Sequence, residues 1–167
     1  MLQSSTSHVS LILHDIRSAH NVGSIFRTAD GAGVAQIYLT GYTPRPTDRF
    51  GRLQPEIVKT ALGAEQTVPY EAADDVADII RRLREEGTMV VAVEQSPGSV
   101  AFTEFTPPER VAYIFGNEVT GLPAEVLGTA DETLELPMRG AKESLNVAVT
   151  AGIVCYHEAR DDVSRVR

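Results

Sequence analysis

The chain has 167 residues, 43% hydrophobic and 23% charged, and its 15 basic and 23 acidic residues give a net charge of −8. This is the composition of one folded domain, and it argues against binding nucleic acid through bulk charge alone. A single cysteine excludes an internal disulfide, the four histidines lack zinc-ligand spacing, and no apolar run reaches the ~18 residues of a membrane span. We therefore expect a cytoplasmic protein with no metal site and no membrane contact.

The charge is unevenly distributed along the chain. Residues 1–60 contain six basic and four acidic residues, whereas the remainder contains nine basic and nineteen acidic residues. A polyanion would therefore be bound by the N-terminal third, although an unevenly charged, solvated surface explains the same counts.

Apolar runs alternate with segments of helical periodicity along the whole chain. The pattern predicts, in order, a strand over 9–14, a helix over 21–32, a strand over 36–40, an Arg-rich loop over 43–55, a helix over 56–62, a strand over 66–70, a helix over 72–86, strands over 88–93 and 111–115, a short helix over 123–128, a strand over 133–138 and a helix over 144–159. Pro69 favours an edge position for its strand. The alternation predicts an α/β fold with a largely parallel sheet flanked by helices.

Ligands of open parallel sheets bind beyond the carboxyl ends of the strands, so the loops there are the candidate site. The first loop leads to Asn21, a favoured N-cap residue, and to Arg27 two turns further on. A plain cap and a surface cation would also explain this spacing. However, Arg27 lies among Phe26, Thr28 and Ala29, where a solvated helix face would carry more charge.

Two later loops carry polar residues beside glycines. Residues 115–123 read Phe-Gly-Asn-Glu-Val-Thr-Gly-Leu-Pro, and Gly116 before Asn117 and Glu118 lets a ligand approach the backbone closely. Residues 136–149 place Ser144 and Asn146 at the start of the final helix. A plain strand-to-helix turn and a simple N-cap are the alternatives for these two loops.

Other catalytic patterns are absent from the sequence. It has no phosphate-binding G-x-x-x-x-G-K-[ST] loop, no G-x-G-x-x-G after the first strand and no G-x-S-x-G nucleophile elbow. Cys155 lies among apolar residues and is expected to be a buried core thiol. The residues alone therefore predict an α/β domain with an adenosine-sized pocket formed by three loops.

Together the three loops resemble the signature motifs of the SpoU (TrmH-like) family of the SPOUT superfamily of S-adenosylmethionine-dependent RNA methyltransferases. The motifs are residues 21–30, 115–123 and 136–149, and the resemblance extends over about 9–158. It implies one SPOUT domain over 1–167 without a separate RNA-binding domain, and a C-terminal trefoil knot. It also implies a homodimer that uses the final helix, with which the small residues Ala148, Ala151 and Gly152 are compatible.

The chemistry implied by the resemblance is methyl transfer from S-adenosylmethionine to a ribose 2′-hydroxyl of tRNA or rRNA. The matching catalytic positions are Arg27, Asn21, Glu118, Ser144 and Asn146, and the cofactor positions are Glu94, Gln95, Ser96, Gly116, Leu136, Met138, Ser144 and Leu145. A guanidinium stays protonated, so Arg27 is interpreted as an electrostatic stabiliser of the developing alkoxide, with a role as general base left open.

The expected RNA contacts are Arg27 and the arginines of the 43–55 loop, Arg45, Arg49 and Arg52. RNA recognition through both halves of a dimer or through another protein is an alternative. Two other functions remain open: methylation of a base nitrogen, and a non-catalytic adenosine- or RNA-binding module. Because Asn21, Arg27, Ser144 and Asn146 are all present, the sequence favours an enzyme.

Overall fold

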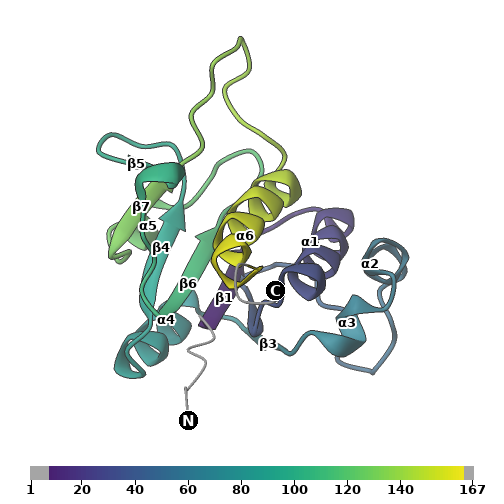
Figure 1. Ribbon diagram of the computed structural model, residues 1–167. Coiled ribbons are helices and arrows are strands. Elements are labelled where there is room, and N and C mark those ends of the chain that lie inside the picture. Colours follow the sequence, from purple (N-terminus) through teal and green to yellow (C-terminus); the bar gives the residue numbers. More distant parts are fainter. Residues whose placement is uncertain (1–7, 164–167) are drawn as a thin grey trace.

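In the computed structural model of the chain, which describes residues 8–163, seven strands form one sheet (Figure 1). All strand pairs are parallel, and the order is β3-β2-β1-β6-β4-β7-β5. The strands are β1 (His8–His14), β2 (Gln36–Thr40), β3 (Tyr70–Ala73), β4 (Met89–Val93), β5 (Val100–Ala101), β6 (Arg110–Phe115) and β7 (Glu132–Glu135). The predicted parallel α/β fold is confirmed.

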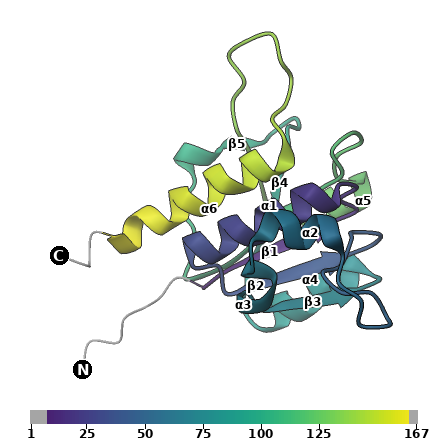
Figure 2. The same cartoon turned by 90° about the vertical axis from the view of Figure 1, so that its right-hand side faces the viewer.

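Helices cover both faces of the sheet (Figures 1 and 2). One face is covered by α1, α2, α3 and α6, and the other by α4 and α5. The bounds are α1 (Ala19–Ala32), α2 (Pro55–Ala61), α3 (Ala64–Thr67), α4 (Val76–Glu85), α5 (Ala124–Leu127) and α6 (Val147–Val163), with a 3₁₀ turn at Phe102–Glu104. Within residues 8–163, no helix is both long and apolar enough to cross a membrane.

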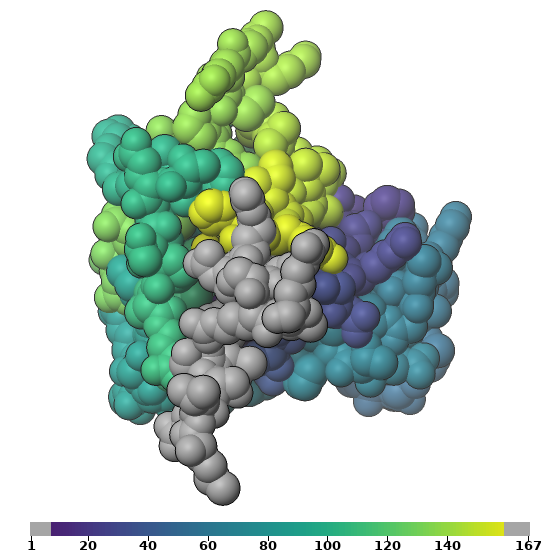
Figure 3. Space-filling model, in the orientation of Figure 1, coloured from purple at the N-terminus to yellow at the C-terminus, as the bar shows by residue number. Residues whose placement is uncertain are grey.

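A long segment, residues 136–146, connects β7 to α6 and stands out from the body of the molecule (Figures 1 and 3). β7 lies between β4 and β5, which the chain connects through residues 94–99. The final segment therefore leaves the sheet from between two strands that precede it in sequence, and it returns over the face that carries α1.

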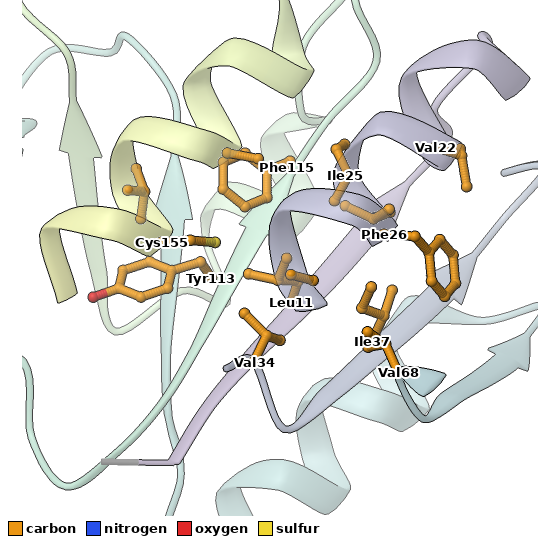
Figure 4. Close-up of a cluster of buried hydrophobic side chains, with 14 of the residues drawn as sticks. Leu11, Val22, Ile25, Phe26, Val34, Ile37, Val68, Tyr113, Phe115 and Cys155 are labelled. Atoms are coloured by element: carbon orange, nitrogen blue, oxygen red, sulfur yellow. The ribbon is translucent and has the colours of Figure 1, made fainter. Parts of the chain in front are cut away.

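The alternation of side chains along each strand divides the core into two layers. Leu11 and Leu13 of β1 pack under α1 and α6, whereas Ile12 between them packs under α4. Figure 4 shows the first layer, where Tyr113 and Cys155 meet between β6 and α6. Cys155 is 2% exposed, as expected of a core thiol, and burial raises its pKa to about 12, with a further contribution from the charge of Glu158.

The predicted strand over 66–70 is wrong. Residues Ala64–Thr67 form α3 after Gly63, and the strand begins only at Tyr70. Pro69 joins the sheet through its carbonyl oxygen, which accepts a hydrogen bond from Ile37 N at 2.9 Å. The predicted edge position is confirmed, because β3 is the outermost strand beside β2.

Capping residues explain several shifted helix ends. Ser18, and not Asn21, caps α1: its hydroxyl accepts from Asn21 N at 3.2 Å. Asp75 caps α4 through Ala77 N, so this helix begins later than predicted.

The short strand β5 was not predicted, and β7 ends at Glu135 rather than at 138.

Helix α1 packs against two neighbouring helices, and its contact with α2 is very close. A side chain on Gly23 would lie 2.5 Å from the Ile57 carbonyl oxygen of α2 and would also collide with the Thr60 side chain. On the other side, a side chain on Gly152 of α6 would meet Thr28 at an ordinary 3.8 Å. The small residues of α6 therefore pack against α1 of the same chain, where Ala151 is fully buried.

We predict that Gly23→Ala destabilises the protein by about 1–3 kcal/mol, because the added methyl group overpacks the α1–α2 contact. In a helix without this contact, the same change would stabilise by about 1 kcal/mol. Gly152→Ala is the matched control and should be neutral or stabilising. The measurement is the free energy of unfolding in urea, and a stabilised Gly23→Ala variant would contradict the described packing.

Candidate functional site

A cavity opens at the carboxyl ends of β4, β6 and β7, where the fold predicts a ligand site. Residues 94–95, 116–121 and 136–147 close it from three sides. Its lining combines apolar side chains with exposed backbone, and consists of Val93, Glu94, Gln95, Phe115, Gly116, Asn117, Glu118, Val119, Gly121, Glu135, Leu136, Met138, Ser144, Leu145, Val147 and Thr150. Apolar walls with main-chain hydrogen-bonding groups suit a nucleoside.

The structure brings most of the predicted cofactor residues to this cavity. They are Glu94, Gln95, Gly116, Leu136, Met138, Ser144 and Leu145. Ser96 lies outside the lining: its carbonyl oxygen accepts from Ser99 N at 3.1 Å and from Ser99 Oγ at 2.8 Å, so it closes a turn instead. Among the described residues, no three His, Cys, Asp or Glu side chains are grouped as metal ligands would be.

Gly116 allows the 116–122 loop to fold back on itself. A side chain there would lie 2.6 Å from Leu122 N and 2.7 Å from the Gly121 carbonyl carbon. Glu94 holds the second half of this loop in place, because its Oε2 accepts a hydrogen bond from Leu122 N at 3.0 Å. Gly116 therefore lines the cavity and also allows the close turn of the loop that forms the cavity wall.

A second cavity adjoins the first and shares part of its wall. Its lining includes Arg17, Ser18, Asn21 and Asn146, together with five residues of the first cavity, Glu118, Val119, Ser144, Leu145 and Val147. Four of the five predicted catalytic residues, Asn21, Glu118, Ser144 and Asn146, therefore lie together, although they are up to 125 residues apart in the sequence.

Hydrogen bonds connect three of these residues in a row. Asn21 Nδ2 donates to Glu118 Oε1 at 3.0 Å, and Asn146 Nδ2 donates to Asn21 Oδ1 at 3.1 Å. Asn146 Oδ1 accepts from Ala148 N at 2.8 Å, so Asn146, and not Ser144, caps α6. The row joins the three loops that carry the sequence motifs.

The Glu118 carboxylate lies at the N-terminus of α1. It accepts from Arg17 N at 2.9 Å and from Ser18 N at 3.1 Å in addition to the Asn21 amide. Partial burial acts to raise the pKa of Glu118, but the hydrogen bonds from Arg17, Asn21 and Ser18 outweigh it, and the pKa lies below its ordinary value. An ionised carboxylate is also favoured by the positive end of the helix dipole.

Arg27 stands apart from this group. It lies six residues beyond Asn21, about 9 Å along the axis of α1, where its side chain is exposed. It belongs to the lining of neither cavity. The predicted arginines Arg45, Arg49 and Arg52 are exposed in the loop after β2, also outside both cavities.

The sequence interpretation did not select Arg17, although it lines the second cavity. A cation directly before the N-cap of a helix is unfavourable next to the positive end of the helix dipole. That mismatch was the available signal, because such a cation needs an anionic neighbour, and the structure places the Glu118 carboxylate there. Val147 and Thr150, at the start of α6, were also missed, and nothing in their sequence pattern marks them.

The chain is similar in sequence to two RNA methyltransferases. A 23S rRNA (guanosine-2′-O-)-methyltransferase, RlmB, from Neisseria meningitidis serogroup B is 33% identical over 92% of this chain and 58% of its own length. A tRNA (guanosine(18)-2′-O)-methyltransferase from Borreliella burgdorferi is 30% identical over 90% of this chain and 66% of its own length. The chain thus spans somewhat less than two thirds of these relatives.

Solved structures are similar over most of the chain. An AdoMet-bound rRNA methyltransferase from Sinorhizobium meliloti superimposes with a TM-score of 0.84 at 33% identity, covering 95% of this chain and 57% of that one. A structure that concerns the 2-OH methylation of C/U34 on tRNA superimposes with a TM-score of 0.79 at 28% identity, covering 95% of this chain and 99% of that one. The pattern of the SpoU rRNA Methylase family matches residues 8–156, so the protein belongs to that family.

Proposed function

We propose that the protein transfers a methyl group from S-adenosylmethionine to a ribose 2′-hydroxyl of tRNA or rRNA. The observation that carries this proposal is the row Glu118–Asn21–Asn146, which joins three separate loops where two cavities meet. The two relatives described above are named as ribose 2′-O-methyltransferases, and one of the similar structures is AdoMet-bound.

The first cavity is assigned to the cofactor. Leu136, Met138 and Leu145 supply apolar walls for an adenine ring, and the exposed backbone at Gly116 supplies hydrogen-bonding groups. When bound, S-adenosylmethionine supplies a methyl group already activated by its sulfonium. The protein then has to orient the acceptor oxygen and exclude water around it.

The second cavity is assigned to the ribose and its phosphate. Arg17 and Ser144 line it, and Asn21 and Asn146 are fixed there by each other and by Glu118. Glu118 is ionised at neutral pH, but three donors already occupy its oxygens, so it is a weak base. We therefore assign it to positioning, and we assign stabilisation of the developing alkoxide to cationic side chains.

We assign Arg27 to the developing alkoxide of an RNA ribose bound across the junction of two protomers, because it lies outside both cavities of its own chain. On α6, next to α1, Val149 and Tyr156 are 51% and 52% exposed, and Ile153 between them is 36% exposed. These residues form an apolar stripe that a second copy would bury, as in a homodimer. Arg27 is exposed on α1 one turn before Gly31, which lies against the Tyr156 hydroxyl, so a second copy on the stripe would lie close to Arg27.

The same proposal includes the knot, the single catalytic domain and the cytosolic compartment. β7 lies between β4 and β5, and α6 returns to pack on α1, which is a chain path compatible with a trefoil knot. The lone, buried Cys155 suits a reducing compartment. The alternatives are a base-nitrogen methyltransferase and a non-catalytic module. The product of the reaction distinguishes both of them from the proposed function.

The first test is an assay with tritium-labelled S-adenosylmethionine and total RNA from a methylation-deficient strain, followed by nucleoside analysis. We expect label in 2′-O-methylnucleosides. Label in base-methylated nucleosides would support the base-nitrogen alternative. Binding of cofactor and RNA without transfer would support the non-catalytic module.

We predict that Arg27→Ala lowers the single-turnover rate by roughly 10²–10³-fold, the scale of one lost stabiliser of a developing oxyanion. The affinity for the cofactor, measured by calorimetry, should change little because Arg27 does not line that cavity. Lys59→Ala, which removes an exposed cation of α2, is the matched control. A rate within threefold of the wild type would remove Arg27 from the mechanism.

We predict that Glu118→Gln lowers the free energy of unfolding at neutral pH, because an amide offers one acceptor oxygen where three donors converge. The pKa of Glu118 is lowered by folding, so its stabilisation is present above the ordinary value of 4.5 and is lost as the pH falls through the folded pKa. The difference between wild type and variant, measured in urea, should therefore shrink on acidification. Glu125→Gln, on the exposed surface of α5, should show no such trend.

A further inference from the structure

The Arg-rich loop after β2 is an ordered hairpin. Thr47 and Leu53 form an antiparallel bridge, and Asp48 N donates to the Arg52 carbonyl oxygen at 2.9 Å. Gly51 adopts a φ of 76° at the turn, and its N–H donates to the Asp48 carbonyl oxygen at 3.0 Å. The hairpin, residues 47–53, therefore holds a fixed shape although most of its residues are exposed.

Phe50 is displayed at the turn of this hairpin. Its side chain is 66% exposed, and the guanidinium carbons of Arg49 and Arg52 lie 4.8 Å and 5.2 Å from its ring centre. The Asp48 carboxylate fixes the backbone on both sides of the turn, accepting from Phe50 N at 2.8 Å and from Arg52 N at 2.9 Å. Folding gains little from an aromatic ring held in water, so the ring is available to a ligand.

The cations of the loop are not equivalent. Arg45 pairs with Asp74 at 3.0 Å, and Arg52 pairs with Asp48 at 2.7 Å. Within the described part of the chain, Arg49 makes no ion pair. Arg49 can therefore turn from the ring to an anion and leave that face of Phe50 free, while Arg52 keeps its place.

The loop that carries the hairpin begins at the carboxyl end of β2, on the same side of the sheet as the candidate site. Tyr42, just before it, donates from its N–H to Asp15 Oδ1 at 3.0 Å, and its hydroxyl accepts from Asn117 Nδ2 at 2.8 Å. Thr43 Oγ1 accepts from Ile16 N at 3.1 Å. Because Asn117 also lines the first cavity, the base of the hairpin is tied to the cavity wall.

An accessible aromatic face beside a free cation fits an unpaired nucleotide, which offers a flat base and a phosphate. A duplex fits poorly because its base faces are stacked on one another. We propose that the hairpin binds an unpaired nucleotide of the substrate RNA, with the base stacked on Phe50 and the neighbouring phosphate held by Arg49. This inference rests on the proposed function, and it assigns to that function a substrate with an unpaired loop or end.

The test compares two fluorescently labelled RNAs, a stem-loop and a blunt duplex of the same length, by anisotropy. Phe50→Ala should bind the stem-loop about 5- to 100-fold more weakly, the loss expected of one stacked base, and should bind the duplex as the wild type does. Phe50→Tyr should keep the stem-loop affinity. Leu53→Ala, at a 57% exposed apolar residue of the same hairpin, is the matched control.

Arg49→Gln should weaken binding to the stem-loop and reduce the slope of log affinity against log salt by about one unit. Wild-type affinity in Phe50→Ala, or equal losses on both RNAs, would overturn the inference. The proposed function would survive that result if the wild type still methylates RNA. A wild type that neither binds nor methylates RNA would overturn both.

Discussion

The Glu118 carboxylate, in the loop after β6, accepts hydrogen bonds from the Arg17 and Ser18 amides and from the Asn21 side chain at the start of α1. A buried or half-buried carboxylate needs such donors, and a helix N-terminus has free N–H groups to offer. The carboxylate and the N–H groups of the helix N-terminus thus satisfy each other's hydrogen-bonding capacity. This bond set fixes the 116–122 loop against α1, and the position of Asn21, and through it Asn146, follows from it.

The same bonds explain why two cavities adjoin each other. The first cavity is walled by the loops after β4, β6 and β7, and the second by the start of α1 and the start of α6. Glu118 belongs to both walls. α1 and α6 can begin side by side because small residues separate them: Ala151 is fully buried, and Gly152 faces Thr28.

Periodicity predicted most of the strands and the larger helices because it reflects local burial. Leu11 and Ile12 face opposite layers, as alternation along a buried strand requires. The errors fall where a single local bond competes with the pattern. Gly63 starts a helical turn where an edge strand was predicted, and Ser18 and Asn146 take the caps that had been expected at Asn21 and near Ser144. A two-residue strand such as β5 is too short to have a period.

The sequence by itself determined the α/β alternation and the three motifs, four of whose five predicted catalytic residues meet in the structure. It determined them because side-chain hydrophobicity and the residues at strand ends are local properties. Only the tertiary structure decided that Asn21 and Asn146 lie in contact across 125 residues while Arg27, six residues from Asn21, lies outside both cavities. The position of β7 between β4 and β5 in the sheet was likewise visible only in the tertiary structure. The physical reason is that such contacts depend on the path of the whole chain, which no spacing within one segment encodes.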